Sequence, residues 1–563
     1  MRQVMQARHP QLADLGLFLL VVALPLVFTP FSVSPFGDPK LVVLAAGTLA
    51  LWTSGFPIDR RLCWAAAAWI VATVVAAFAG VDLAVGLTAR TEGQGGGAIV
   101  IACAGLLAVL GGALPEDLRN RTRRWFVASS SVVAMLGLAI RVFPDLSSSL
   151  PSGMELIGAT VGNQLFAAAL MSAAIAAAIA GPRGDGVEDR PADVTAWTVA
   201  LVAFLALGAA TFGERSSIVL PIVAAAAALW RARFALRTTI VLASAVLVPL
   251  VAWQALDAVV FPDTLGRGAA VTGIAAQTTD LHRVTVWRAM TRAAAERPLL
   301  GWGPGSSKSA YLAAARPSEV ALAGRQWSDA HNLFLETAVS SGVLGLAALV
   351  WLATLLSIRA FQASRERAWA FGAAAGLAAY SIVEPIGLVL TPLLFLFAGM
   401  AGGPGERSPD VDGDRAAWVP RSVSWGVALS LILATVVSLQ MQAAASFERW
   451  GRTYGEPWAL ERALAIQPWR VSAAQRLALR RALDGRAGSA SDAEAARDLI
   501  AAAVRRHPWD ADVRFWAADV ETLLRDETAS RAWIEQQLRR FPGDAATVAD
   551  PGRSDLEKPR SGA

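Results

Sequence analysis

Long apolar runs recur along the chain from about residue 15 to about residue 441, and short polar segments rich in arginine separate them. Each run is close to the roughly 20 residues that an α-helix needs to cross the hydrocarbon core of a membrane. The pattern therefore predicts an all-α fold, a polytopic transmembrane helical bundle of about thirteen spans. The predicted spans are 15–33, 38–56, 63–80, 97–114, 125–143, 161–180, 195–213, 216–233, 238–256, 332–358, 368–384, 387–403 and 423–441.

Beyond residue 441 the chain becomes polar and charged, and this tail contains an internal repeat. Residues 505–510 (Arg-Arg-His-Pro-Trp-Asp) match residues 539–544 (Arg-Arg-Phe-Pro-Gly-Asp) at an offset of 34 residues, and an earlier Gln-Pro-Trp copy stands at 467–469. The period resembles tetratricopeptide repeats and predicts a helical repeat domain over 446–546, with a concave surface for a protein partner. The alternative is a plain helical hairpin packed on the membrane domain. Residues 547–563 are predicted to be disordered.

Composition agrees with a membrane protein, since 55% of the 563 residues are hydrophobic and the mean hydropathy is +0.46. The pI of 9.7 comes almost entirely from arginine, which in a membrane protein sets orientation and does not indicate a nucleic-acid partner. Five basic clusters fall on one side of the predicted bundle: Arg60–Arg61, Arg119–Arg124, Arg231–Arg237, Arg359–Arg367 and Arg407–Arg421.

The positive-inside rule makes that side cytoplasmic, together with residues 1–14, so a multi-pass protein of the cytoplasmic (inner) membrane is expected. The longest loop, 257–331, is then extracytoplasmic, and with an odd number of spans the C-terminal tail is too. Arg2 and Arg8 before the first apolar run imitate a signal peptide. No small-residue cleavage site follows them, so a retained first helix is predicted.

Cysteine and histidine usage indicates neither a disulfide framework nor a metal centre. The two cysteines, Cys63 and Cys103, both lie in apolar runs, and the chain has only four histidines. Neither HExxH, paired CxxC, Walker A nor GxGxxG occurs. We therefore expect no metal and no cofactor.

The loop 257–331 carries eight basic residues against six acidic ones. A net positive loop outside the cytoplasm runs against the positive-inside bias, and an anionic ligand would explain it. Arg215, in the predicted outer turn Phe212–Ser216, adds to this positive charge. The alternative for Arg215 is that it only extends towards lipid headgroups.

Within the loop, the pattern from Leu281 to Arg297 predicts an amphipathic helix that ends at Pro298. Arg283 and Trp287 are four residues apart and share a face of this helix, where a guanidinium presents a fork of donors that matches phosphate oxygens. The alternative is a cation–π pair that holds the loop together. Next comes Pro-Leu-Leu-Gly-Trp-Gly-Pro-Gly at 298–305, whose Gly301, Gly303 and Gly305 predict a fixed turn that brings backbone N–H groups near a phosphate.

His331 stands where this loop meets the tenth predicted span. An imidazole at the outer edge of a membrane can accept a proton near neutral pH, and the alternative is a histidine that caps the helix starting at 332. Asn332 follows, and after nine more residues come Gly342 and Gly345, which are expected to let a neighbouring helix approach closely.

The pattern His331-Asn332-x9-Gly342-x2-Gly345 resembles the signature of the O-antigen ligase and polymerase superfamily. Several other features resemble that family in the same order along the chain: Arg90-x-Glu92-Gly93, Gly162-Asn163, the Arg215 turn, Arg283-x3-Trp287 and the glycine-rich turn. Gly213-Glu214 before Arg215 departs from the commoner small residue or serine, and simple ligases lack the tail. Both departures leave the acceptor open.

This resemblance implies a metal-independent glycosyltransferase of the GT-C type. The donor would be a glycan on undecaprenyl diphosphate, and the acceptor a glycan or lipid hydroxyl, or a protein hydroxyl in the related oligosaccharyltransferases. The implied roles are His331 as catalytic base, Arg215 and Arg283 as diphosphate binders, and Arg90, Arg288, Trp287, Asn332 and Asn163 as further substrate-binding residues.

Two hypotheses from other classes stay open at this stage. A transporter or lipid flippase would have as many spans, but repeated halves and charges deep within spans are typical of that class, and the charges here lie at the predicted outer edge. Glu384 beside Pro385 is the nearest exception and is interpreted as a turn between helices. A non-catalytic scaffold for polysaccharide export would instead recruit partners through its repeat tail.

Overall fold

The computed structural model describes residues 9–29, 31–88, 97–143, 160, 164–180, 195–212, 216–260, 274–325, 327–362, 364–383, 387–403, 416–417 and 419–549. These residues are helical throughout, apart from connecting turns and a two-residue antiparallel pairing of β1 (Ile58–Asp59) with β2 (Ala416–Ala417). The expected all-α fold class is therefore confirmed for the described chain.

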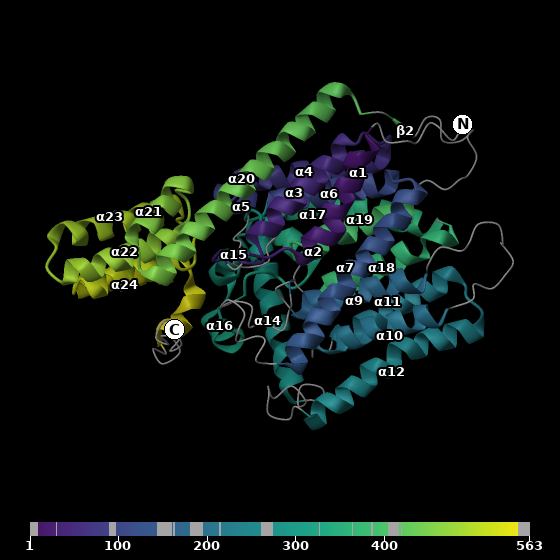
Figure 1. Ribbon diagram of the computed structural model, residues 1–563. Coiled ribbons are helices and arrows are strands. Elements are labelled where there is room, and N and C mark those ends of the chain that lie inside the picture. Colours follow the sequence, from purple (N-terminus) through teal and green to yellow (C-terminus); the bar gives the residue numbers. More distant parts are fainter. Residues whose placement is uncertain are drawn as a thin grey trace.

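A helix overlaps each of the thirteen predicted spans, and Figure 1 shows these helices gathered into a bundle. Among the described residues, five helices are long and apolar enough to cross a membrane, namely α4, α7, α12, α17 and α20, and six further apolar stretches are shorter. The total number of crossings stays a prediction. The bundle helices are α1 (Pro10–Phe18) continued by a π-type turn (Leu19–Ala23) and α2 (Leu24–Leu26), α3 (Asp38–Thr53), α4 (Arg60–Ala79), α6 (Ala98–Ala113), α7 (Glu116–Val142), α9 (Gln164–Ile179), α10 (Ala196–Ala210), α11 (Ser216–Ala232), α12 (Leu236–Val260), α17 (Leu333–Gln362), a 3-10 turn (Arg365–Arg367), α18 (Ala368–Val383), α19 (Leu390–Gly402) and α20 (Arg421–Tyr454).

The first helix ends earlier than the predicted span 15–33, and a buried lysine explains why. Lys40 on α3 donates from Nζ to the carbonyl oxygens of Leu24, Pro25 and Val27 at 3.0, 3.3 and 2.7 Å. Carbonyls at a helix C-terminus have no partner within the helix, and here the ammonium group supplies one. The chain therefore leaves the helix after Leu26.

Small residues let neighbouring helices of the bundle approach closely. A Cβ added to Gly111 of α6 would lie 2.4 Å from the carbonyl oxygen of Leu396 on α19, and one added to Gly399 would lie 2.2 Å from that of Ala108. Large apolar side chains are exposed on the outer surface of the bundle, among them Trp64 on α4 and Trp425 on α20. Such a surface suits a lipid environment, in agreement with an integral membrane protein.

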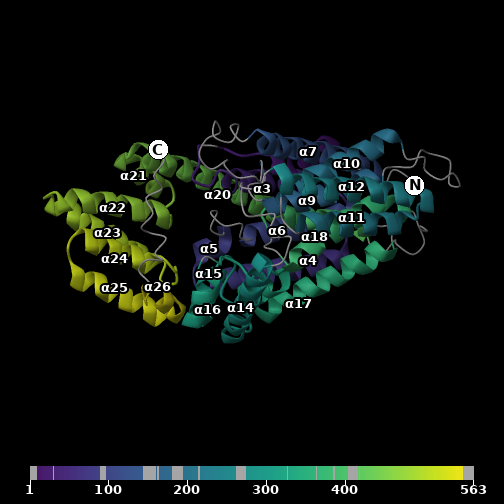
Figure 2. The same cartoon turned by 90° about the horizontal axis from the view of Figure 1, so that it is seen from below.

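The described part of the loop before α17 contains the helices α14 (Ile274–Glu296), α15 (Ser307–Ala314) and α16 (Pro317–Ala323), at one end of the bundle. The short helix α5 (Leu83–Thr88) lies at the same end of the bundle, as Figure 2 shows. α14 starts seven residues before Leu281, where the amphipathic helix was predicted to begin, and it ends just before Pro298 as expected.

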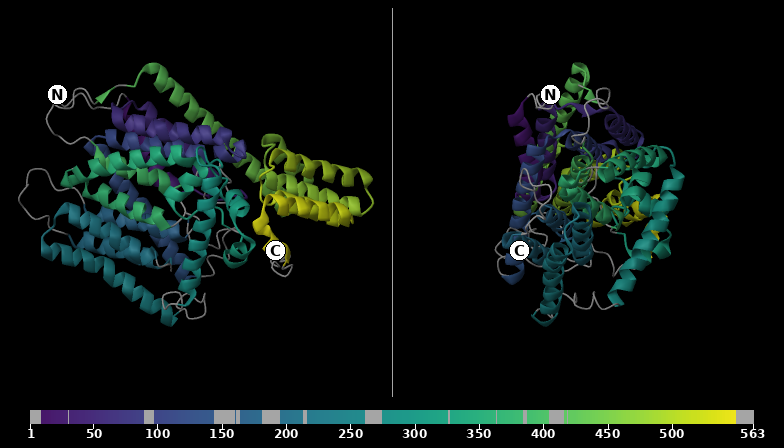
Figure 3. Two further views of the ribbon diagram at one scale, coloured as in Figure 1. Left: turned by 180° about the vertical axis from the view of Figure 1, so that it is seen from behind. Right: turned by 90° about the vertical axis from the view of Figure 1, so that its right-hand side faces the viewer.

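The tail is helical as predicted, and α20 leads into it along the outside of the bundle (Figure 3). Its helices are α21 (Pro457–Ile466), α22 (Val471–Arg486), α23 (Ala490–Arg506), α24 (Val513–Leu523), α25 (Glu527–Arg540), a 3-10 turn (Pro542–Asp544) and α26 (Ala545–Ala549). Consecutive helices pack as hairpins, α22 on α23 and α24 on α25. The tetratricopeptide assignment stays a prediction. α26 extends to Ala549, three residues into the segment predicted to be disordered, and residues 550–563 lie outside the described chain.

The tail and the long loop lie at the same end of the bundle. His507 Nδ1 is 2.5 Å from Asp82 Oδ2 in the loop after α4, and Asp512 Oδ2 is 2.6 Å from Lys308 Nζ on α15. These contacts agree with the expectation that loop and tail face one compartment. That expectation requires an even number of membrane crossings between them, as four crossings by α17, α18, α19 and α20 would give. The number of crossings and the extracytoplasmic side both stay predictions.

Candidate active site

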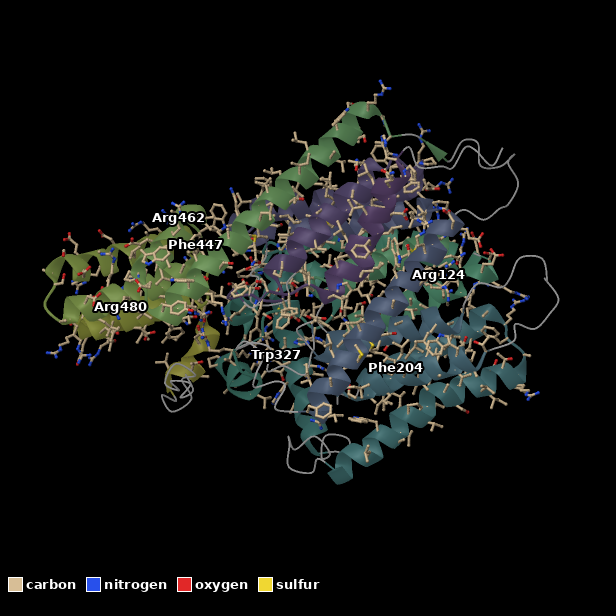
Figure 4. All side chains as sticks on the ribbon, viewed as in Figure 1. Arg124, Phe204, Trp327, Phe447, Arg462 and Arg480 are labelled. Carbon is tan, nitrogen blue, oxygen red and sulfur yellow. The ribbon has the colours of Figure 1, made fainter. Side chains whose placement is uncertain are left out.

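The turn that carries His331 has an unusual backbone conformation just before α17. His331 has a φ of +47°, in the left-handed region that few residues other than glycine adopt. Its backbone N–H donates to Asp329 Oδ1 over 2.9 Å, and the same oxygen lies 3.7 Å from His331 Nε2. The indole of Trp327, labelled in Figure 4, packs edge-on to the imidazole with 4.6 Å between centroids. Such strain persists only where surrounding contacts enforce it, which is common at functional sites.

A carboxylate on α17 holds this turn from inside the protein. Glu336 Oε2 accepts the backbone N–H of Ala330 at 2.9 Å, and Oε1 accepts the hydroxyl of Ser307 on α15 at 2.5 Å. Glu336 is absent from the candidates chosen from the sequence. The signal for it was an acidic residue within a predicted span, which is costly in a membrane unless it has a task.

Two of the predicted substrate-binding residues also fix the His331 turn. Trp287 on α14 donates from Nε1 to the carbonyl oxygen of Ala330 at 2.8 Å. Asn332 caps α17, because its Oδ1 accepts the N–H of Leu335 at 2.9 Å, while its Nδ2 donates to the carbonyl of Ile382 at 2.9 Å. The residue that caps α17 is therefore Asn332 and not His331. The side chain of His331 is 21% exposed.

The glycine-rich turn 298–305 fits into a break in α17 at Gly342, whose φ is +64°. Gly301, Gly303 and Gly305 have φ values of +69°, +98° and +70°, which only glycine adopts without strain. Three backbone hydrogen bonds join the turn to the break: Trp302 N–H to Val339 O (2.8 Å), Gly303 N–H to Ser340 O (3.0 Å) and Val343 N–H to Pro298 O (2.7 Å). The turn thus supplies partners for groups that α17 leaves unpaired at its break.

This arrangement corrects two expectations. The segment that approaches Gly342 is the glycine-rich turn and not a neighbouring helix, since a Cβ there would lie 2.3 Å from the carbonyl of Leu299. Gly345 faces Ser341 and Thr337 of its own helix. The expectation that backbone N–H groups of the turn bind a phosphate is also wrong for three of them. The N–H groups of Gly301, Trp302 and Gly303 already donate to carbonyl oxygens.

Much of the positive charge of the loop is compensated inside the protein. Lys308 and Arg325 both contact Asp512 of the tail, at 2.6 and 2.9 Å, and Arg325 also contacts Asp544 at 3.0 Å. Burial lowers the pKa of Arg325, but the two carboxylates outweigh burial and hold that pKa above its ordinary value. The charge surplus that suggested an anionic ligand therefore has a second explanation, the acidic residues of the tail.

A further ion pair closes the loop on itself between α14 and α16. Arg292 pairs with Glu319, whose carboxylate also accepts the backbone N–H of Arg316 at 2.8 Å. Burial raises the pKa of Glu319, but the N–H of Arg316 and the guanidinium of Arg292 outweigh it, so the pKa lies below the ordinary value. Arg283 lies one turn before Trp287 on the same helix and is half-buried, and Arg288 is exposed. These two arginines on α14 are the described cations closest in sequence to Trp287.

An open groove of about 380 Å³ lies between α14 and α17, next to the His331 turn. Its surface is mostly apolar. Seven residues line it: Trp287, Thr291, Asn332, Phe334, Leu335, Ala338 and Leu346. Two of these residues, Trp287 and Asn332, also fix the His331 turn, so the apolar groove adjoins that turn.

Three predicted site residues, Arg215, Arg90 and Asn163, lie outside the described residues, so the structure does not locate them. Glu384 and Pro385 lie outside them too. Within the described chain, no group of three or more His, Cys, Asp or Glu residues is arranged to hold a metal ion. The residues that the structure does bring together are His331, Asp329, Glu336, Trp287 and Asn332.

Comparison with known proteins agrees with the resemblance drawn from the sequence. Residues 199–350 match the family model described as O-Antigen ligase, a segment that runs from α10 into α17 and contains Arg283, the glycine-rich turn and His331. The resemblance to this superfamily is therefore confirmed for that segment. A search of the curated proteins gives no match to the chain.

Proposed function

We propose that this chain, which carries an O-antigen ligase domain, transfers a glycan from undecaprenyl diphosphate to an acceptor hydroxyl on the outer face of the cytoplasmic membrane. The observation that carries the proposal is the fixed His331 turn beside an apolar groove, inside the segment that matches O-antigen ligases. A polyprenyl-diphosphate donor has an apolar chain and an anionic headgroup. Its site therefore needs apolar surface next to polar and cationic groups.

In the proposed reaction His331 takes the proton of the acceptor hydroxyl. The acceptor oxygen forms a bond to the anomeric carbon of the donor sugar, and the bond from that carbon to the diphosphate oxygen breaks. Undecaprenyl diphosphate leaves with the bonding electrons, and direct displacement inverts the anomeric carbon. Asp329, 3.7 Å from His331 Nε2, would stabilise the imidazolium that forms.

The charge of the leaving diphosphate needs compensation by preorganised cations. Arg283 is proposed for this role together with Arg215. Arg283 lies one helical turn from Trp287, which contacts the His331 turn and lines the groove. The groove would take the first part of the prenyl chain. Arg90, Arg288 and Asn163 are retained as proposed secondary contacts to the donor or acceptor.

The direct test is the glycan product of cells that carry His331→Ala. Loss of a positioned general base typically costs about 10² to 10⁴ in rate, so the product band on a gel should disappear while the protein is still inserted in the membrane. His9→Ala is the matched control, because His9 is exposed at the start of α1 and belongs to no part of the proposed site. A normal product band from His331→Ala would remove the role of His331.

The same site would serve a protein hydroxyl, the acceptor of the related oligosaccharyltransferases. The product distinguishes the two acceptors, since the transferred glycan then migrates with protein and not with lipid or free polysaccharide. A transporter or a scaffold would leave the bond between sugar and diphosphate intact.

A further inference from the structure

We infer that the C-terminal repeats act within the same chain as a positioning element of the active site. The inference rests on the proposed function and assigns a task to the tail. Two copies of the repeated turn, residues 507–510 and 541–544, dock on the loop that precedes His331. Trp509 and Asp512 are its positioning residues.

The docked surfaces are close-packed and polar as well as apolar. The hydroxyl of Ser309 donates to the carbonyl oxygen of Trp509 at 2.5 Å. Phe541 is fully buried in a core that it shares with Tyr311 and Leu312 of α15. A Cβ added to Gly543 would lie 2.9 Å from Val320 Cγ2. Packing this close leaves no room for an added methyl group, as in a protein interior.

Ion pairs also join the tail to the loop beside the buried contacts of Phe541. Asp512 contacts both Lys308 and Arg325, and Arg325 also reaches Asp544. His507 contacts Asp82, and these two side chains are 4% and 8% exposed. The tail therefore joins two separate outer segments, the loop after α4 and the loop before α17.

Trp509 reaches the turn that fits into α17. Its ring packs edge-on to Trp302 with 5.4 Å between centroids, and the guanidinium of Arg297 lies 4.6 Å from the Trp302 ring and 5.5 Å from the Trp509 ring. Arg540 lies over Trp509 at 4.3 Å. The indole of Trp302 is fixed further by a 2.8 Å hydrogen bond to the carbonyl of Ala293.

From Trp302 a continuous set of contacts leads to His331. The backbone N–H of Trp302 donates to the carbonyl oxygen of Val339 at the break in α17. Ser307, five residues after Trp302, donates to Glu336, which binds the N–H of Ala330 beside His331. A tail that is released from Trp302 and Lys308 would loosen both connections. Misplacement of a catalytic group by about 1 Å can cost about 10²-fold in rate.

The three copies of the repeated turn have different environments, which gives a matched control. In the first copy, Arg470 pairs with Glu448 at 2.5 Å within the tail, and Trp469 lines a groove of about 310 Å³ between tail helices. Trp469 and Trp509 occupy equivalent positions, each directly after the proline of its repeat copy. Of these two indoles, that of Trp509 packs on Trp302. Removing each indole in turn separates docking from repeat stability.

The test compares the purified full-length protein with Asp512→Lys, which repels Lys308 and Arg325, and with the charge swap Asp512→Lys plus Lys308→Asp. Asp512→Lys should lower kcat about 10- to 100-fold, with a smaller change in the donor KM. The charge swap should restore most of the lost kcat. Trp509→Ala should behave like Asp512→Lys, and Trp469→Ala like the wild type. Glu535→Lys, an equal charge change on the exposed surface of α25, is the control for tail charge.

A normal kcat in Asp512→Lys, or a loss that the swap fails to restore in protein inserted to the wild-type level, would overturn the inference. Amide hydrogen exchange across residues 298–305 keeps it testable without activity. Exchange there should be faster in Asp512→Lys and slow again in the swap, and unchanged exchange would contradict docking through Trp302. If the wild type itself transfers no glycan, the proposed function fails, and exchange alone decides whether the tail holds the turn.

Discussion

The hydroxyl of Ser307 donates a 2.5 Å hydrogen bond to Glu336 Oε1, and the other oxygen of that carboxylate accepts the N–H of Ala330, next to His331. Ser307 begins α15 and Glu336 lies in the first turn of α17, so one buried side chain joins the loop to the helix that follows it. Glu336 therefore holds the backbone beside the proposed base without contacting the imidazole through either hydrogen bond.

Glu336→Gln should separate positioning from folding. Glutamine has the shape of glutamate, but its NH2 group cannot accept a hydrogen bond, so either Ser307 or Ala330 loses its acceptor. We expect kcat to fall about 10- to 100-fold while donor KM changes less. Steady-state kinetics on purified protein measure both, and an unchanged kcat would show that the network does not position His331.

Gly342→Ala should destabilise the protein. A methyl group there would lie 2.3 Å from the Leu299 carbonyl, and the φ of +64° is strained for alanine, at a cost of about 1–3 kcal/mol before the clash is counted. The thermal midpoint in detergent should drop. Gly426→Ala on α20 is the control, because nothing lies within 4 Å of its added Cβ, and its midpoint should not fall. Equal midpoints for both variants would contradict the close contact with the turn.

Arg283→Lys tests whether the proposed diphosphate contact needs a guanidinium. Lysine keeps the positive charge but cannot present two parallel donors, so the donor KM should rise about tenfold or more, the equivalent of about 1.4 kcal/mol. Arg288→Lys, on the exposed part of the same helix, should change it less. Wild-type kinetics for Arg283→Lys would exclude bidentate binding at this position.

Asp519 gives the tail a pH-dependent stability. Burial raises the pKa of this carboxyl to about 6. Because the folded-state pKa lies above the unfolded one of about 3.9, ionisation opposes folding, and stability is lost as the pH rises through about 6. Asp519→Asn cannot ionise, so it should protect the tail from protease at pH 8 relative to wild type and lose that advantage near pH 4. An advantage that is the same at both pH values would contradict this assignment.

Hydrophobic periodicity predicts the helices of the bundle, because a span of apolar residues has few other structures open to it in a membrane. Boundaries depend on contacts that the local sequence does not contain. The first helix stops at Leu26 because Lys40, fourteen residues later, takes over its carbonyl oxygens. The prediction that starts at Leu281 also misses about the first two turns of α14, which begins at Ile274.

Site residues could be predicted where the local sequence around them is distinctive, and their long-range partners could not. His331 and the glycine-rich turn stand out in the sequence, and the structure places both against α17, His331 just before its first residue and the turn at its break. Glu336 had a signal as an acidic residue within a predicted span, but the task of its carboxylate depends on Ser307, which is 29 residues away. Lys308 and Arg325 pointed to an anionic ligand because their partners, Asp512 and Asp544, lie 204 and 219 residues further on. Long-range pairing of this kind is set by the fold and is not visible in a loop's net charge.

The release of undecaprenyl diphosphate from a donor labelled in its lipid decides whether His331 activates the acceptor. Purified wild type should release the labelled diphosphate only when acceptor is present, in step with glycan transfer. His331→Ala, inserted and folded to the same extent, should be slower by about 10² to 10⁴. Release by His331→Ala at the wild-type rate would contradict the proposed mechanism.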